Sequence, residues 1–211
     1  MIEIELRYKI ETEPDMSTFT LINEKAQRDV YYDVSQNGFE YALFQTRNFI
    51  RVRNGRSIDF KLDIGDDGHN FCKETNFDIE SINDKNQGFL DVFNAVGISI
   101  EKGFNSFDEF IAVNKFFIFC PIDKKRKTYN EKDGVTVMLD DVKDLGMFVE
   151  VEVDLDDSDV SNKDEIVKGM EAFLRTNKLI TENDERQGVG YVEMYLKRYN
   201  PSAYELGFFK N

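Results

Sequence analysis

The stretch MIEIELRYKI (residues 1–10) alternates apolar and charged residues along its whole length. The apolar positions are Ile2, Ile4, Leu6, Tyr8 and Ile10, and the charged positions are Glu3, Glu5, Arg7 and Lys9. Since successive strand side chains point to opposite faces, the pattern predicts a strand with two carboxylates and two cations on one face. Taken alone, such a face is typical of a solvated strand whose charges pair with neighbouring strands. The alternative is a buried face, which requires matching charges or a ligand.

A second strand with the same kind of face is predicted near the other end of the chain. In MFVEVEVD (147–154), three valines alternate with Glu150, Glu152 and Asp154. Carboxylates two residues apart on one face lie about 7 Å apart at the backbone. Two such strands that converge could bind hard divalent cations such as Mg²⁺ or Mn²⁺, which prefer oxygen ligands. A single E-x-E pair usually marks only a solvated strand face.

Cations also recur at alternating strand positions. Besides Arg7 and Lys9 in the first strand, the set consists of Arg51, Arg53, Lys61, Lys124 and Arg126. Each of these alone would be read as a surface charge that favours solubility. Together they match a polyanion, and the guanidinium groups can bind phosphate oxygens in a bidentate manner.

The order of the predicted elements favours an α+β fold built on an eight-stranded antiparallel β-barrel with helices packed outside. Strands are predicted at 2–10, 29–34, 48–53, 57–63, 71–80, 123–129, 135–140 and 147–154. Asn54-Gly55 predicts a hairpin turn between the third and fourth strands. Helices are predicted at 83–96, after the capping box Ser106–Glu109, at 163–176 and near 190–199. Because no linker or repeat interrupts the chain, we expect residues 1–211 to form a single domain. A barrel of this size can hold one small ligand.

Composition excludes several classes of protein. A formal net charge of −14 argues against nucleic acid as a partner, because binding to phosphate backbones requires a basic surface. No apolar run approaches the length of a membrane span, so we expect no membrane association. Two isolated cysteines, Cys72 and Cys120, fit no metal-binding spacing and are consistent with a reducing, cytoplasmic location.

At this point the chain resembles the CYTH superfamily, also called triphosphate tunnel metalloenzymes. The residues that carry the resemblance follow the family's order: Glu3-Ile-Glu5-Leu-Arg7 for E-x-E-x-K, Tyr32-Asp33, Arg51-Val-Arg53, Lys61, Lys124-Lys-Arg126 with Tyr129, LDDVKDLGMFVEVE (139–152) with Asp140, Glu150 and Glu152, and YVEM (191–194). The set spans nearly the whole chain, and its order is more specific than any of its parts.

The resemblance implies a barrel whose tunnel binds a small-molecule triphosphate, so that the charges of residues 1–10 point inward. It implies that Mg²⁺ or Mn²⁺ is held by Glu3, Glu5, Glu150 and Glu152, together with Asp140. It implies that phosphate is bound by Arg7, Lys9, Arg51, Arg53, Lys61, Lys124 and Arg126. The candidate catalytic residues are Glu5, Lys9 and Asp140. The expected activity is metal-dependent phosphoryl transfer, in first place hydrolysis of inorganic triphosphate, thiamine triphosphate or a nucleoside triphosphate.

Three departures from the family pattern affect nucleotide recognition more than the triphosphate and metal site, and two other functions stay open. Arg7 replaces the signature lysine, residues 71–80 match the family's R-x-E-x-E strand only through Lys73 and Glu74, and the connection 98–120 is long. A class IV adenylyl cyclase, which makes cyclic AMP and pyrophosphate from ATP, would use the same residues. A non-catalytic barrel that binds polyphosphate or a nucleotide is the third reading. The phenylalanine-rich stretch 104–119 could cover the barrel or join a homodimer, although core packing is the preferred interpretation.

Overall fold

The structure, a computed structural model, describes residues 2–63, 70–130, 134–155 and 162–207. The chain forms two compact units. The first unit comprises Met1–Gln27, Ile64–Cys72 and Ile122–Met194, and the second comprises Arg28–Asp63, Lys73–Pro121 and Tyr195–Asn211. The expectation of a single domain over 1–211 stays a prediction.

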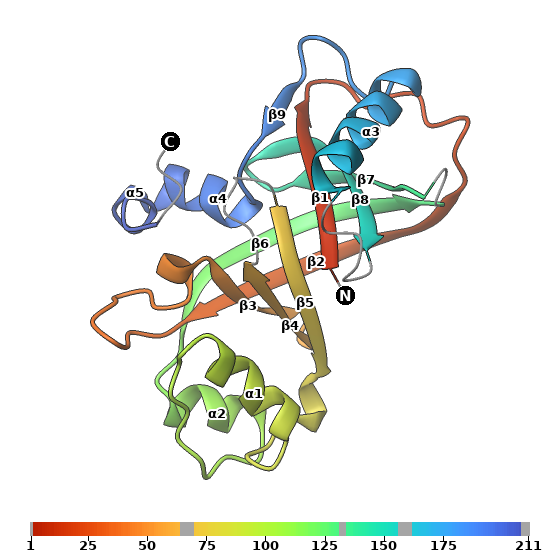
Figure 1. Cartoon of the computed structure of the whole chain (residues 1–211). Helices are drawn as coiled ribbons and strands as arrows, with labels where there is room; N and C mark the ends of the chain where they lie inside the picture. Colours follow the sequence, from red (N-terminus) through yellow and green to blue (C-terminus); the bar gives the residue numbers. More distant parts are fainter. Residues whose placement is uncertain (1, 64–69, 131–133, 156–161, 208–211) are drawn as a thin grey trace. The chain divides into compact units, whose positions relative to one another are not determined.

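The strands form one hydrogen-bonded sheet (Figure 1). They are β1 (Ile2–Ile10), β2 (Leu21–Asp33), β3 (Asn48–Arg53), β4 (Ser57–Asp63), β5 (Asn70–Asp78), β6 (Phe117–Tyr129), β7 (Thr136–Val142), β8 (Gly146–Leu155) and β9 (Glu185–Gln187). Their order is β5-β4-β3-β2-β6-β7-β8-β1-β9, and β5 also pairs with β1. The order of the first eight strands therefore closes on itself, and the predicted fold class, an eight-stranded antiparallel barrel, is confirmed.

The four predicted helices are present, and a further short helix, Pro201–Tyr204, was not predicted. In chain order, the helices are η1 (Phe44–Thr46), η2 (Ile79–Ser81), α1 (Gln87–Ala95), α2 (Phe107–Val113), α3 (Lys163–Thr176), α4 (Tyr191–Tyr199) and α5 (Pro201–Tyr204). Helix α1 begins four residues later than predicted, because the side chain of Asn86 accepts a hydrogen bond from Phe89 N and caps the helix there. The Ser106 side chain caps α2 in the same way. Helix α3 has the predicted bounds.

Three strands differ from the sequence prediction. Strand β2 begins at Leu21 and β6 at Phe117, several residues before the predicted starts, and β9 was not predicted. The added part of β2 is exposed at most positions, so no buried face imposes an alternating pattern on it. Its extended shape comes from pairing with β6 rather than from its own periodicity. By contrast, the turn at Asn54 and Gly55 is confirmed, since both residues have positive φ, 53° and 66°.

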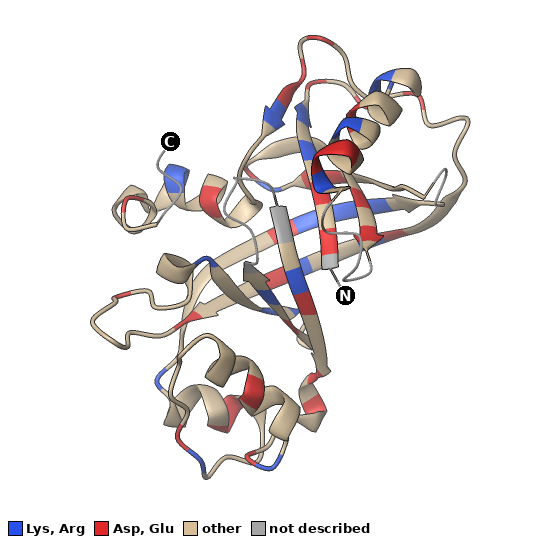
Figure 2. Ribbon diagram, viewed as in Figure 1, with Lys and Arg blue, Asp and Glu red and all other residues tan. Residues whose placement is uncertain are grey.

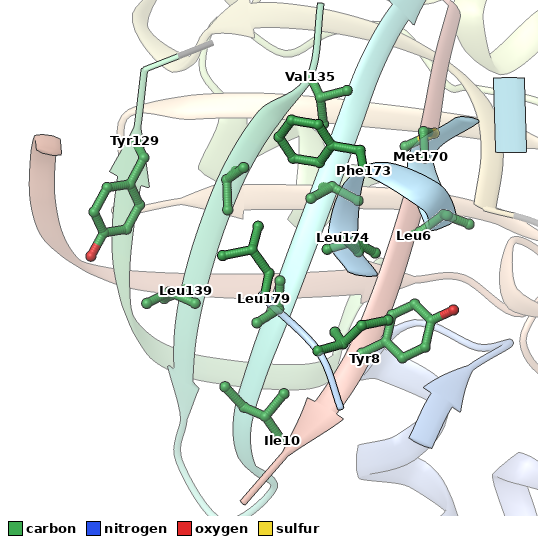
Figure 3. Close-up of a cluster of buried hydrophobic side chains, with 14 of the residues drawn as sticks. Leu6, Tyr8, Ile10, Tyr129, Val135, Leu139, Met170, Phe173, Leu174 and Leu179 are labelled. Atoms are coloured by element: carbon green, nitrogen blue, oxygen red, sulfur yellow. The ribbon is translucent and has the colours of Figure 1, made fainter. Parts of the chain in front are cut away.

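The core of the first unit lies between β1, β7, β8 and α3. The apolar face of β1 contributes Ile4, Leu6, Tyr8 and Ile10, each at most 5% exposed. Met170, Phe173 and Leu174 of α3 pack against this face, as Figure 3 shows. Because one face of β1 is filled by this core, its charged residues must all lie on the opposite face.

The core of the second unit is rich in phenylalanine. Phe60 of β4 lies 5.0 Å from Phe93 and 5.7 Å from Phe89 of α1, between ring centroids. Phe104 and Phe110 are completely buried, and each packs against Phe89. The preferred interpretation of the stretch 104–119, core packing, therefore holds for these residues. A homodimer stays a prediction.

Asp33, which the sequence analysis singled out beside Tyr32, holds the chain after β2. Its carboxylate accepts hydrogen bonds from the backbone N–H groups of Val34, Leu43 and Phe44 at 2.7–3.0 Å. The residue is 1% exposed, and burial raises its pKa to about 6 even though these three bonds act in the opposite direction. Asp33 therefore has a structural role.

We expect Asp33→Ala to lower the free energy of unfolding by about 2–3 kcal/mol, because it leaves buried backbone donors without an acceptor. Urea denaturation measures the change. The control is Asp15→Ala, which removes an exposed carboxylate that accepts a similar bond from Ser17 N. Equal stability of the two variants would contradict the structural role.

Candidate functional site

The charged face of β1 is buried. Glu3, Glu5 and Arg7 are 5–8% exposed, whereas Lys9 at the end of the strand is exposed. Strand β1 runs antiparallel to β8, which places Glu5 directly opposite Glu152 and Arg7 directly opposite Glu150. Figure 2 shows both charge signs along β1. A solvated strand face is therefore the wrong interpretation for the first three charges.

Arg7 joins two carboxylates of this face. Its Nε and one terminal nitrogen donate to Glu150 Oε2 at 2.8 and 2.6 Å, and the same terminal nitrogen donates to Glu5. The other terminal nitrogen donates to the carbonyl oxygen of Val189 at 3.2 Å. Although burial opposes it, the charge of Glu150 raises the pKa of Arg7, so the guanidinium remains a cation. Arg7 therefore holds Glu5 and Glu150 together.

Asp140 of β7 collects a second group of donors. It accepts from Lys124 Nζ at 2.9 Å and from two nitrogens of Arg126 at 2.7 and 2.6 Å. The Tyr191 hydroxyl donates to the same carboxylate at 3.0 Å. Although burial opposes it, Arg126 and Lys124 lower the pKa of Asp140, which keeps it ionised. Arg126 also donates to Glu150 and so connects this group to the carboxylates beside Arg7.

Glu3 and Glu152 are two neighbouring carboxyl groups of the cluster. Burial, followed by the charge of Glu3 and a hydrogen bond with it, raises the pKa of Glu152 to about 8. A raised carboxyl pKa of this kind means that two nearby carboxylates are costly to ionise together. A divalent cation would remove that cost, and carboxylate oxygens are the ligands that Mg²⁺ and Mn²⁺ prefer.

The charge balance of the first unit also fits a metal ion. The predicted metal ligands Glu3, Glu5, Asp140, Glu150 and Glu152 all lie in this cluster, with Arg7, Lys124 and Arg126. These five carboxylates outnumber the three cations, so full ionisation would leave negative charge in excess. A divalent cation would reduce that excess, so the donor set fits Mg²⁺ or Mn²⁺.

The second unit holds three of the other four predicted phosphate-binding cations; the fourth, Lys9, lies in the first unit. Arg51 donates to Asp59 at 2.9 and 2.7 Å, and Arg53 forms a bidentate pair with Asp29 at 2.9 and 3.1 Å. Lys61 lies 2.7 Å from Glu74 of β5. Although burial opposes it, Lys61 and then Arg51 lower the pKa of Glu74. The weakly matched strand 71–80 therefore does supply a carboxylate to this group.

Two residues of α4 belong to the first cluster, although the sequence analysis gave them no role. The Arg7 guanidinium lies 4.1 Å from the Tyr191 ring centroid, and Lys124 Nζ lies 5.0 Å from it. Glu193 is 4% exposed, and burial raises its pKa. A Cβ atom at Gly190 would lie 2.8 Å from the Glu193 carboxylate, so a larger residue there would displace that side chain. The match of YVEM (191–194) to a family motif was the sequence signal that could have identified Tyr191 and Glu193 as site residues.

Comparison with known families gives a direct result. The CYTH domain model matches residues 1–189. The chain belongs to the CYTH domain family. This result confirms the resemblance that the ordered motifs indicated.

Individual relatives are distant but cover almost the whole chain. A Methanocaldococcus jannaschii protein named "putative adenylate cyclase" is 25% identical, over 92% of this chain and 98% of its own. Among solved structures, a Pyrococcus horikoshii OT3 protein has a TM-score of 0.62 and 22% identity, covering 92% and 98% of the two chains. A Hippeastrum protein named "putative adenylyl cyclase" and described as having a dominant triphosphatase activity has a TM-score of 0.57 and 17% identity, covering 93% of this chain and 95% of its own. These structural similarities establish the fold.

As a CYTH protein, the chain belongs to a family of enzymes that act on small triphosphate substrates and use divalent metals. Relatives are named for adenylate cyclase or triphosphatase activity. Within the residues that the structure describes, no helix is both long and apolar enough to cross a membrane.

Proposed function

We propose that this CYTH protein is a metal-dependent phosphoryl-transfer enzyme that hydrolyses a triphosphate-containing substrate. The observation that carries the proposal is the buried cluster of the first unit, in which five carboxylates meet three cations. Carboxylates in excess of their cations suit a divalent metal, whereas the arginines and the lysine suit phosphate oxygens. A triphosphate bound together with a divalent metal would pair with both the carboxylates and the cations of this cluster.

Separate residues would serve the two tasks. Glu3, Glu5 and Glu152, with Glu150 beside them, would hold Mg²⁺ or Mn²⁺, which when bound supplies Lewis-acid polarisation of a phosphoryl oxygen. Lys124 and Arg126 in the first unit would bind phosphate oxygens, whereas a phosphate-binding role for Arg51, Arg53 and Lys61 in the second unit stays a prediction. A polyanion would replace the carboxylates that these cations contact in the structure. Asp140 is engaged by three side chains, which favours a positioning role over direct metal ligation.

The chemical step of hydrolysis is a displacement at phosphorus. A water oxygen forms a bond to the terminal phosphorus as the bond to the bridging oxygen breaks. One proton of the water is released, and the bridging oxygen leaves on the diphosphate product. Cations on the phosphate oxygens stabilise the charge that spreads over them in the transition state. Glu5 and Lys9 as catalytic residues, and Arg7 and Lys9 as phosphate contacts, stay predictions.

A second candidate is supported by the name of the Methanocaldococcus jannaschii relative. In an adenylyl cyclase the 3′-hydroxyl of ATP attacks the α-phosphorus, and pyrophosphate leaves. The same carboxylates and cations would serve that reaction, so only the products distinguish the two functions.

The test is a product assay on the purified protein with Mg²⁺ or Mn²⁺. ATP, thiamine triphosphate and inorganic triphosphate are offered separately, and orthophosphate, pyrophosphate and cyclic AMP are quantified. We expect release of orthophosphate. Cyclic AMP with pyrophosphate would identify a cyclase, and metal-dependent triphosphate binding without turnover would identify a non-catalytic binding protein.

A further inference from the structure

The Arg7 side chain is buried and has contacts along its edge and on one face. Its edge contacts Glu5, Glu150 and the carbonyl oxygen of Val189, and its flat face lies against the Tyr191 ring. The side chain is only 5% exposed. A guanidinium bound in this way has little freedom to turn, because its planar fork is matched to two carboxylates at once.

The carboxylates that Arg7 contacts are also predicted metal ligands. Both oxygens of Glu150 are engaged by arginines, Oε2 by Arg7 and Oε1 by Arg126. Glu5 Oε1 is engaged by Arg7. A metal ion that used these same oxygens would have to displace a cation from them, and the two positive charges would repel each other across a distance of a few ångströms.

We infer that Arg7 is an internal counter-ion that competes with the divalent metal for Glu5 and Glu150 and thereby weakens metal binding. The inference rests on the proposed function, because it takes Glu5 and Glu150 as metal ligands. It assigns Arg7 a role in setting metal affinity. It also gives a reason for the contacts of this side chain with two carboxylates and an aromatic ring.

An arginine at this position differs physically from the lysine of the family pattern. A lysine ammonium is a compact charge on a flexible stem, and it cannot form the planar fork with which Arg7 joins Glu5 to Glu150. A lysine could also leave the carboxylates at smaller cost, because its ammonium group has no planar face to stack on the Tyr191 ring. The arginine is therefore the stronger competitor for the metal-binding oxygens.

The experiment measures Mn²⁺ affinity by calorimetry in the absence of any triphosphate, for the wild type, Arg7→Gln and Arg7→Lys. Loss of one positive charge beside the carboxylates should increase the Mn²⁺ affinity of Arg7→Gln by about tenfold or more. Arg7→Lys should show a smaller increase. The control is Arg186→Gln, which removes an arginine of β9 that pairs with Glu171 of α3 and should leave Mn²⁺ affinity unchanged.

Each outcome is decisive. If Arg7→Gln binds Mn²⁺ no more tightly than the wild type, the inference is wrong; if that variant does not fold, the same criterion applies to Arg7→Lys. Should the wild type bind Mn²⁺ and turn over substrate while neither variant gains affinity, only the inference fails. Should no form of the protein bind Mn²⁺, with or without triphosphate, the proposed metal site fails with it. Thermal unfolding with added Mn²⁺ gives an independent readout, since tighter binding raises the unfolding temperature further.

Discussion

Glu5→Gln is expected to reduce turnover of the best triphosphate substrate by about a hundredfold to a thousandfold. The substitution keeps the size of the side chain but removes one negative charge from the buried cluster of β1 and β8. Metal ions typically contribute several kcal/mol of transition-state stabilisation, and each 1.4 kcal/mol corresponds to about a factor of ten in rate. The measurement is kcat at saturating Mg²⁺ or Mn²⁺, together with Mn²⁺ affinity.

The matched control for this variant is Glu13→Gln. Glu13 pairs with Lys127, and its side chain is 47% exposed, so the same chemical change there should leave turnover unchanged. Circular dichroism would establish that both variants keep their secondary structure. Near-wild-type turnover in Glu5→Gln would remove Glu5 from the metal site and weaken the proposed function as a whole.

Much of the fold could be predicted because local signals agreed with one another. The alternation in residues 1–10 and 147–154 identified two strands, and the periodicity of 163–176 gave the bounds of α3 without error. Two of the missed strand segments have no buried face. The first half of β2 is exposed, and β9 has only three residues, so neither carries an alternating pattern that sequence analysis could detect.

The sequence could predict which residues belong to the candidate site, but not which of them contact one another. Alternation alone cannot say which face of a strand is buried, because both faces of β1 have the same period. Only the registers of β1 with β8 and of β6 with β7 bring Arg7 opposite Glu150 and Arg126 opposite Asp140. Tyr191 enters from α4, 51 residues after Asp140, and nothing in the local sequence links the two.

Because Asp140 lies opposite Arg126 in this pairing, we expect its substitution to affect more side chains of the site than any other single change. Its carboxylate is the shared acceptor of Lys124, Arg126 and Tyr191, and it is 2% exposed. Asp140→Asn removes a carboxylate partner of the buried Lys124 and leaves Arg126 with Glu150 alone. Removing one member of a buried ion pair typically lowers the free energy of unfolding by about 3–5 kcal/mol, and we expect a loss in this range.

The effect of Asp140→Asn on activity should exceed what lost stability explains. Lys124 and Arg126 would no longer be held in place for phosphate, so kcat/KM should fall by about a hundredfold even at temperatures where the variant is fully folded. Asp141→Asn is the control, because the neighbouring carboxylate points to the opposite face of β7 and is itself exposed. Unfolding curves and steady-state kinetics of the two variants separate the structural from the catalytic contribution. A folded Asp140→Asn protein with wild-type kcat/KM would mean that Lys124 and Arg126 do not depend on this carboxylate, and that phosphate is bound elsewhere.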